Sequence, residues 1–161
     1  MTVRLAEERD FPVILDIYAR ARRFMAETGN PTQWGTAHPA PEMLQQDIAE
    51  KHLYVVTDGE TIRGVFSFLV GPDRTYDLIE DGAWHSDAVY GTIHRIAADG
   101  TGGVFATALD YCRTRASYLR IDTHADNKVM QHVVTKNGFR RCGIIYTDSG
   151  SPRIAFDRIE N

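Results

Sequence analysis

The sequence has few cysteines, no strong excess of one charge and no long apolar run. Its two cysteines, Cys112 and Cys142, are too few for a disulfide framework and lack the Cys-x-x-Cys spacing of zinc or redox sites, so both are predicted to be reduced and buried. The net charge of −4 is atypical of nucleic-acid binders, which usually carry a basic excess or stripe. No apolar run approaches the roughly 20 residues that a membrane-spanning helix needs.

The first ten residues, MTVRLAEERD, also lack the apolar segment of a signal peptide. We therefore expect a cytoplasmic protein that binds neither nucleic acid nor membrane. A length of 161 residues suits one domain, since roughly 100–200 residues per domain is usual. The 43% of hydrophobic and 25% of charged residues are the balance of an ordinary globular protein. The prediction is a single domain over residues 1–161.

Apolar periodicity and turn residues divide the chain into seven strands and four helices. The strands are predicted over 2–6, 53–57, 61–70, 88–97, 117–124, 139–147 and 152–159, and the helices over 11–27, 41–51, 102–116 and 126–137. Since helices alternate with strands in the second half and hairpins dominate the middle, the pattern predicts an α/β (α+β) fold. We expect one mixed, mostly antiparallel central sheet of about seven strands, with helices on both faces.

Short polar residues and glycines mark the predicted ends of these elements. Asp10 is expected to cap the first helix and Asp126 the last one, because a carboxylate accepts the unpaired N–H groups of a helix start. Gly138 is expected to end the last helix in the left-handed C′ position. The dipeptide Asp58-Gly59 predicts a tight hairpin.

Three glycines lie in the segment ADGTGGVF, residues 98–105, between a strand-like run and a helical pattern. The segment is not a Walker loop, because Gly-Lys-Ser/Thr is missing, and it is not the GxGxxG fingerprint of dinucleotide-binding proteins. A helix start offers unpaired backbone N–H donors and the positive end of the helix dipole, so glycines before it let a phosphate come close. A plain glycine-rich turn between strand and helix is the other interpretation.

A second motif follows downstream, where NKVMQHVVTKNGF contains Asn127, Lys136, Gly138 and Phe139. Together with the glycine segment, it resembles the GNAT family of acetyl-CoA-dependent N-acetyltransferases, in particular a bacterial subgroup. The resemblance covers nearly the whole chain and is most specific over residues 93–142. The family's phosphate loop reads Arg/Gln-x-x-Gly-x-Gly/Ala. The matching GTGGVF differs from it, since Gly100 replaces the Arg or Gln and Phe105 replaces the small final residue.

The resemblance implies a GNAT-like fold and the transfer of an acetyl group from acetyl-CoA, the cosubstrate, to a primary amine by direct attack. It also implies that main-chain groups at the end of the preceding strand bind the pantetheine and the acetyl carbonyl, while N–H groups of the glycine segment bind the pyrophosphate. The residues expected to bind the cofactor are Ile96, Ala97, Ala98, Gly100, Thr101, Gly102, Gly103, Val104, Phe105 and Asn127.

Direct attack needs a base for the ammonium and an acid for the leaving thiolate. His94 is the preferred catalytic base, because its unperturbed pKa near 6.5 is close to working pH; a histidine hydrogen-bonded within the sheet is the alternative. His124 is the second candidate, or it helps to cap the helix that follows. For the acid, Val134 stands where many family members have a tyrosine; Tyr146, Tyr90 or a water can substitute, or no acid is needed.

Two irregular segments are expected to border the acceptor site. Trp34 lies in one and Trp84 in the other, where each either lines the pocket or packs on the core. The second segment, 71–87, is acidic and can attract a cationic amine through its summed charge, although a solvated loop explains each residue singly. Its acidic candidates are Asp77, Glu80, Asp81 and Asp87.

No metal is predicted. The histidines weighed for such a site show neither HExxH nor short paired spacing; they are His85, His94, His124 and His132. The expected partner is a small-molecule amine or a peptide amine, and a homodimer stays open. Two other functions remain in competition with acetyl transfer. One is a non-catalytic acyl-CoA or CoA-binding sensor or interaction module, and the other is a nucleotide-phosphate binder.

Overall fold

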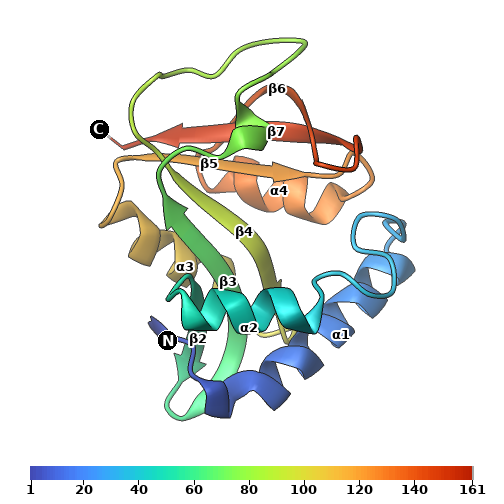
Figure 1. The fold of residues 1–161 in the computed structure, drawn as a ribbon, viewed down its shortest axis with the longest axis vertical. Coiled ribbons are helices and arrows are strands. Elements are labelled where there is room, and N and C mark those ends of the chain that lie inside the picture. Colours follow the sequence, from blue (N-terminus) through green and yellow to red (C-terminus); the bar gives the residue numbers. More distant parts are fainter. Residues whose placement is uncertain (161) are drawn as a thin grey trace. The chain divides into compact units, whose positions relative to one another are not determined.

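The computed structural model describes residues 1–160 of the chain, which form seven strands, four α-helices and two short 3-10 helices (Figure 1). The strands are β1 (Thr2–Leu5), β2 (Leu53–Asp58), β3 (Thr61–Val70), β4 (Gly91–Ala98), β5 (Tyr118–Thr123), β6 (Arg140–Tyr146) and β7 (Pro152–Ile159). The helices are α1 (Phe11–Glu27), α2 (Pro41–Ala49), α3 (Val104–Arg113) and α4 (Lys128–Lys136), with η1 (Glu8–Asp10) and η2 (Arg74–Tyr76) as single 3-10 turns. The predicted order of strands and helices is confirmed.

The seven strands form one mixed sheet in the order β1-β2-β3-β4-β5-β7-β6. The pairs β1/β2, β2/β3, β5/β7 and β6/β7 are antiparallel, whereas β4 and β5 are parallel. The last strand, β7, lies between β5 and β6, so its side chains meet neighbours on both edges. The predicted mixed, mostly antiparallel sheet is confirmed.

The chain divides into two compact units. Unit 1 contains Met1–Phe68 and His94–Tyr111, and unit 2 contains Leu69–Ile93 and Cys112–Asn161. Strands β3 and β4 each run from one unit into the other. A single domain over residues 1–161 stays a prediction.

Helices cover both faces of the strands in unit 1. Val55 and Val65 point to one face and pack against buried residues of α1 and α2. Tyr54 and Phe66 point to the other face, because successive strand residues alternate. There the Tyr111 ring of α3 lies 5.0 Å from Tyr54 and 6.4 Å from Phe66, measured between ring centroids. The prediction of helices on both faces is therefore met within this unit.

In unit 2, the segment 71–90 and α4 lie on opposite sides of β5 and β7 (Figure 1). The segment packs through aromatic rings: the centroids of Tyr76 and Trp84 are 5.0 Å apart, and those of Tyr90 and Tyr118 are 6.2 Å apart. These rings join a buried cluster that includes residues of β6 and β7. A connection whose only helix is the short 3-10 turn η2 is thus packed against the sheet.

Two of the predicted helix caps are wrong. The Asp10 carboxylate makes no cap hydrogen bond to α1; it accepts the Glu7 N–H at 2.8 Å and pairs with Arg4 at 2.7 Å. The cap of the last helix lies one residue later than predicted, since the Asn127 side-chain oxygen, rather than Asp126, accepts the Met130 N–H at 2.9 Å. Arg4 and the Glu7 N–H thus occupy the Asp10 carboxylate. The Asp126 carboxylate lies 3.7 Å from the His124 Nδ1.

Other local predictions are confirmed. Gly138 follows α4 with a φ of 88°, the left-handed conformation expected at C′. The β2–β3 hairpin turns at Gly59, whose φ is 62°. Cys112 and Cys142 are free and buried. Within residues 1–160, no helix combines the length and apolarity needed to cross a bilayer.

Candidate functional site

Strand β4 carries a kink in unit 1. Arg95 has a φ of 51°, a left-handed conformation that side chains other than glycine rarely adopt inside a strand. Its carbonyl oxygen accepts the Tyr18 O–H at 2.6 Å, and its guanidinium pairs with the buried Asp47 carboxylate. Burial raises the pKa of Tyr18, so its phenol stays a neutral donor. The kink is therefore held through both its backbone and its side chain.

The residues predicted to bind pantetheine by their main chains follow this kink directly. Ile96 and Ala98 are half-buried, and Ala97 is buried. Irregularities of this kind redirect strand groups and are frequent beside active sites. In the sequence, the charged Arg95 interrupts the otherwise strand-like run IHRIA. This was a signal for an irregular strand position that the prediction did not use.

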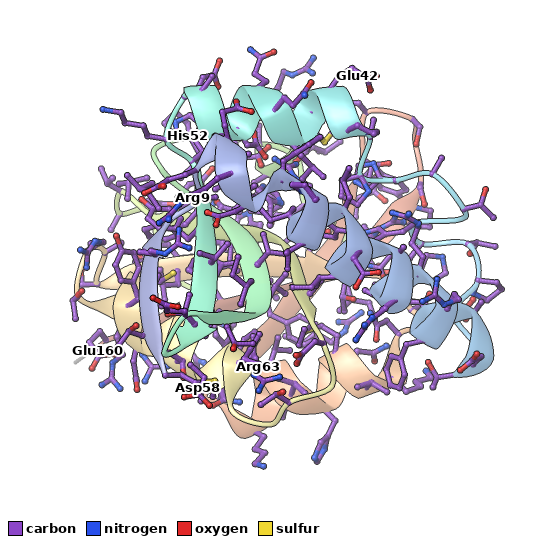
Figure 2. All side chains as sticks on the ribbon, turned by 90° about the horizontal axis from the view of Figure 1, so that it is seen from below. Arg9, Glu42, His52, Asp58, Arg63 and Glu160 are labelled. Atoms are coloured by element: carbon purple, nitrogen blue, oxygen red, sulfur yellow. The ribbon has the colours of Figure 1, made fainter. Side chains whose placement is uncertain are left out.

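A turn over residues 99–103 connects β4 to α3 and is organised by Asp99. The Asp99 carboxylate accepts the Thr101 N–H at 2.9 Å and an Arg63 N–H at 3.1 Å. Burial alone would raise the pKa of Asp99, but the hydrogen bonds from Thr101 and Arg63 outweigh it and the pKa is lowered. Arg63 projects from the β2–β3 hairpin region, which also contains Asp58 (Figure 2). The Thr101 N–H is thus engaged by Asp99 in this structure, and its contact with the cofactor stays a prediction.

The three glycines of the turn are exposed, but the backbone conformation favours glycine at only two of the three positions. Gly100 and Gly103 have φ values of 100° and 88°, which favour glycine whatever surrounds them. Gly102 has no such φ, and a Cβ built on it would meet no heavy atom of the described chain within 4 Å. Neither the backbone nor the packing therefore requires a glycine at position 102.

Helix α3 begins at Val104, directly after the glycine turn. The Gly103 carbonyl accepts both the N–H of Thr107, at 3.0 Å, and its hydroxyl, at 2.8 Å, so Gly103 occupies the cap position. The helix supplies no acceptor for first-turn N–H groups such as those of Val104 and Ala106. Gly64 of β3 makes room for this helix start, since a Cβ there would lie 2.4 Å from the Val104 Cγ1. The exposed turn and the helix start together form a site suited to an anion.

His94 is half-buried on β4, one residue before the kink and in the same unit as the glycine turn. Its catalytic role stays a prediction. His124 lies in unit 2 at the end of β5, where its Nδ1 accepts the Asp126 N–H at 3.0 Å. Two roles were considered for His124, a catalytic base and a cap for the helix that follows. This contact corresponds to the second role, because it lies just before α4. Asn127 caps α4 in the same unit, and its cofactor contact also stays a prediction.

The two tyrosines considered as the acid, Tyr146 and Tyr90, lie in unit 2, and so does Val134, which stands in place of the expected tyrosine. Val134 is fully buried in α4. The Tyr146 hydroxyl donates to the Glu80 carboxylate at 3.0 Å, and this hydrogen bond raises the pKa of Tyr146. The Tyr90 hydroxyl accepts the Asp73 N–H at 2.7 Å. Tyr146 is the more accessible of the two tyrosines, whereas Tyr90 is buried.

Both tryptophans pack on the cores of their own units. The Trp34 ring lies edge-on to Tyr18 with centroids 5.6 Å apart. The Trp84 Nε1–H donates to the Tyr76 carbonyl at 3.0 Å, and the Arg120 guanidinium stacks 4.0 Å above the Trp84 ring. The acidic residues predicted to attract an amine are all exposed; they are Asp77, Glu80, Asp81 and Asp87.

Sequence reasoning missed a cluster in unit 2 that is formed by His85, Cys142 and Asp157, whose ligand-type atoms lie within 4.8 Å of one another. His85 was weighed only against other histidines. No short spacing could reveal this cluster, because His85 is 57 residues from Cys142 and 72 residues from Asp157.

Comparison with solved structures identifies the fold. The acetyltransferase of the GNAT family from Streptococcus agalactiae 2603 is 28% identical, with a TM-score of 0.90 over 99% of this chain and 95% of that chain. The ribosomal-protein-alanine N-acetyltransferase from Brucella melitensis is 18% identical, with a TM-score of 0.65 over 99% of both chains. A chain of the NatC complex bound to Gag peptide and CoA is 11% identical, with a TM-score of 0.61 over 100% of both chains.

These structures define the class of fold, which is that of acetyltransferases. In particular, the fold is that of the GNAT family, as the sequence resemblance implied. No family model and no curated protein matches the sequence.

Proposed function

We propose that this protein is an N-acetyltransferase that uses acetyl-CoA and acetylates a primary amine by direct attack. One observation carries the proposal: the exposed turn before α3 has a glycine at position 102 that neither its backbone nor its packing requires. Close approach of a ligand phosphate is a physical reason for that glycine. The acetyltransferase fold of the neighbours, one of which is bound to CoA, supports the same ligand.

The residues of the turn fit a pyrophosphate. Gly102, Gly103 and the first turn of α3 offer backbone donors, and the helix dipole adds a favourable field without any basic side chain. The nearby Asp99 carboxylate would repel an anion, but its charge is paired with Arg63 and its oxygens accept two N–H groups. Backbone donors also explain why Gly100 and Phe105 are tolerated where the family has other side chains.

Acetyl-CoA would supply an activated thioester, and this chain's residues would position and deprotonate the amine. In the proposal, His94 takes a proton from the substrate ammonium, and the neutral amine then attacks the thioester carbonyl while the CoA thiolate leaves. Main-chain groups of Ile96, Ala97 and Ala98 bind the acetyl carbonyl and the pantetheine. Because the kink at Arg95 is fixed by Tyr18 and Asp47, these donors are oriented before the reaction begins.

The acceptor in this proposal is the amine of a peptide or of a small molecule. Two neighbours bear names that point to peptide amines, a ribosomal-protein-alanine N-acetyltransferase and a NatC complex bound to a peptide. The exposed acidic residues of the 71–87 segment favour a cationic amine through their summed charge. A second candidate function is CoA binding without catalysis, which Val134 favours because it cannot donate a proton.

The test combines binding and turnover. The purified chain is incubated with acetyl-CoA and a panel of small amines and peptides, and free thiol is measured over time. Thermal unfolding is followed with CoA and, separately, with ATP. We expect protection by CoA and thiol release with at least one amine. Protection by CoA without turnover across the panel would favour the non-catalytic binder, and protection by ATP alone would overturn both functions.

A further inference from the structure

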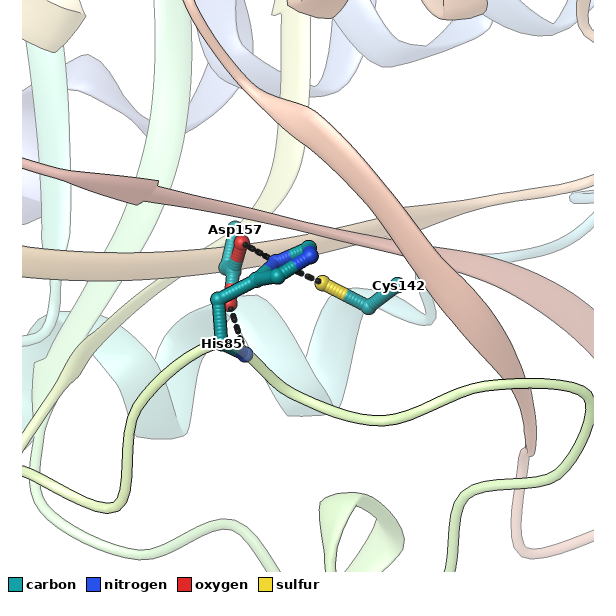
Figure 3. Close-up of side chains that lie close together, drawn as sticks. All are labelled: His85, Cys142 and Asp157. Carbon is teal, nitrogen blue, oxygen red and sulfur yellow. Dashed lines mark hydrogen bonds and ion pairs between the residues drawn. The ribbon is translucent and has the colours of Figure 1, made fainter.

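Three side chains converge in unit 2 from segments that are far apart in the sequence (Figure 3). His85 comes from the 71–90 segment, Cys142 from β6 and Asp157 from β7. The His85 Nδ1 lies 2.7 Å from the Asp157 Oδ1 and 3.4 Å from the Cys142 Sγ. Cys142 and Asp157 are 5% and 1% exposed, while the His85 side chain is 32% exposed. One nitrogen, one sulfur and one oxygen donor therefore lie around a common point at the border of the core.

The backbone is shaped to build this cluster. In the β6/β7 register Arg141 pairs with Phe156 and Gly143 with Ala155, so Cys142 is the extra residue of a bulge. The 71–90 segment approaches that bulge closely, because a Cβ on Gly82 would lie 1.9 Å from the Cys142 carbonyl oxygen.

Two further contacts hold His85 in position. Glu80 forms an isolated bridge with Ile144, with hydrogen bonds of 2.9 and 2.7 Å. The backbone N–H of His85 itself donates to the Asp157 Oδ2 at 2.8 Å. The backbone that positions the histidine is thus fixed at Glu80, before it in the chain, and at the N–H of His85 itself.

A second layer of groups orients the carboxylate. The Tyr118 hydroxyl donates to the Asp157 Oδ2 at 2.7 Å, and the Arg120 Nε–H donates to the Tyr118 oxygen at 3.2 Å. The Arg120 guanidinium is held between the rings of Trp84 and Tyr90, 4.0 Å from each centroid. With Oδ2 engaged by two donors, Oδ1 is the oxygen directed at His85 and Cys142. Carboxylates that bind metals are typically hydrogen-bonded in this way.

The arrangement does not suit a nucleophilic cysteine. In a catalytic triad the nucleophile and the orienting carboxylate use different ring nitrogens of the histidine, whereas here both contact Nδ1. Burial, followed by the hydrogen bond with Asp157, raises the pKa of the Cys142 thiol to about 12. Both features disfavour a free thiolate that attacks a substrate.

We infer that His85, Cys142 and Asp157 form a binding site for a divalent transition-metal ion, with zinc as the ion best suited to this mixed nitrogen, sulfur and oxygen set. Metal–ligand bonds of about 2.0–2.3 Å place ligand atoms about 3.5 Å apart around a tetrahedral zinc ion. The Sγ–Nδ1 separation of 3.4 Å already matches, and the Nδ1–Oδ1 separation of 2.7 Å must open by less than an ångström. A water would complete the fourth position.

Binding exchanges protons for the ion. The Cys142 Sγ loses its proton to solvent as the sulfur–metal bond forms. The His85 Nδ1 binds the metal through its lone pair, so the ring carries its proton on Nε2 in the metal-bound form. The ion would tie the 71–90 segment to β6 and β7, and this role is independent of the proposed acetyl transfer.

The experiment uses the full chain without an affinity tag and after removal of bound metal. Zn²⁺ is titrated in competition with a chromophoric chelator, and Co²⁺ is added to a second sample for its absorption spectrum. We expect one equivalent of Zn²⁺, a raised melting temperature, and a thiolate-to-cobalt charge-transfer band. Cys142→Ser and His85→Ala should each weaken Zn²⁺ binding by about 10- to 100-fold or more, and Cys142→Ser should abolish the cobalt band.

The matched control is Cys112→Ala, which removes the chain's other buried cysteine and should leave both signals unchanged. His85 is partly exposed, so His85→Ala decides the question if Cys142→Ser fails to fold. Absence of stoichiometric binding, a titration unaffected by His85→Ala, or an equal loss in the Cys112→Ala control would overturn the metal site. None of these outcomes depends on whether the protein turns over acetyl-CoA.

Discussion

The two compact units build their candidate sites from different parts of the chain. In unit 1, the site consists mainly of backbone groups that follow one another over residues 95–106, from the β4 kink to the first turn of α3. In unit 2, the cluster consists of side chains brought from a connecting segment and two strands. A backbone site tolerates side-chain changes but depends on glycines. A side-chain site depends on the identity of each ligand and on the register that places it.

The largest expected effect is a loss of turnover on substitution of His94, the one side chain in unit 1 with a proposed catalytic role. His94→Ala should lower kcat/KM at neutral pH by about 100-fold or more, because a general base typically contributes that much. CoA affinity should stay nearly unchanged, since the binding groups are backbone. Steady-state kinetics and CoA titration measure both. His132→Ala, on the exposed face of α4, is the control. Equal turnover in the two variants across the pH range would remove His94 from the mechanism.

The next effect tests the backbone contact in unit 2. Gly82→Ala should lower the free energy of unfolding by more than about 1 kcal/mol, because Gly82 has a φ of 152° and its new Cβ would meet the Cys142 carbonyl at 1.9 Å. Urea denaturation measures the change. The matched control is Gly102→Ala, which adds the same methyl group where nothing lies within 4 Å. Similar stabilities for both variants would contradict the difference between the two units.

A smaller effect separates binding from folding in unit 1. Gly102→Val should weaken CoA binding by roughly 10-fold by crowding the phosphate, while the free energy of unfolding changes by less than about 0.5 kcal/mol, as at other surface positions. Isothermal titration calorimetry and denaturation give the two values. Ala26→Val on the exposed face of α1 controls for the added side chain. Unaltered CoA affinity in Gly102→Val would count against a phosphate site at this turn.

The smallest effect is a pH dependence of the glycine turn. The pKa of Asp99 is lowered in the folded chain, so its charge stabilises the fold above the unfolded pKa of about 3.9, and this contribution is lost as pH falls through the folded pKa. Asp99→Asn should therefore be less stable by about 1 kcal/mol at pH 7, and the difference from the parent chain should shrink as pH falls through the folded pKa of Asp99. Denaturation curves at several pH values test this. A difference that stayed constant with pH would rule out the charge as its cause.

Long periodic elements could be predicted from the sequence. The bounds of α1 and β7 agree with the prediction, because their apolar residues repeat over 17 and 8 residues. The glycine turn was also predictable, since the residues that form it are contiguous. The caps at Asp10 and Asp126 were wrong because neighbouring groups compete for the same hydrogen bonds, and the sequence does not say which one prevails.

The cluster in unit 2 could not be predicted, because it depends on strand register. Cys142 lies next to Asp157 only because β7 lies between β5 and β6 and a bulge shifts β6. The position of His85 depends in addition on the path of the long 71–90 segment, which the sequence does not define. The anchoring of the β4 kink by Tyr18 and Asp47 likewise depends on packing between α1, α2 and β4.

The packing of the two tryptophans has a consequence for spectroscopy. The chain has two tryptophans, and each unit contains one. Trp34 packs against Tyr18, which holds the β4 kink, and Trp84 precedes His85 and stacks on Arg120. Each unit therefore has its own intrinsic fluorophore. In a Trp84→Phe chain the emission would report on the surroundings of the kink, and in a Trp34→Phe chain it would report on the segment that carries His85.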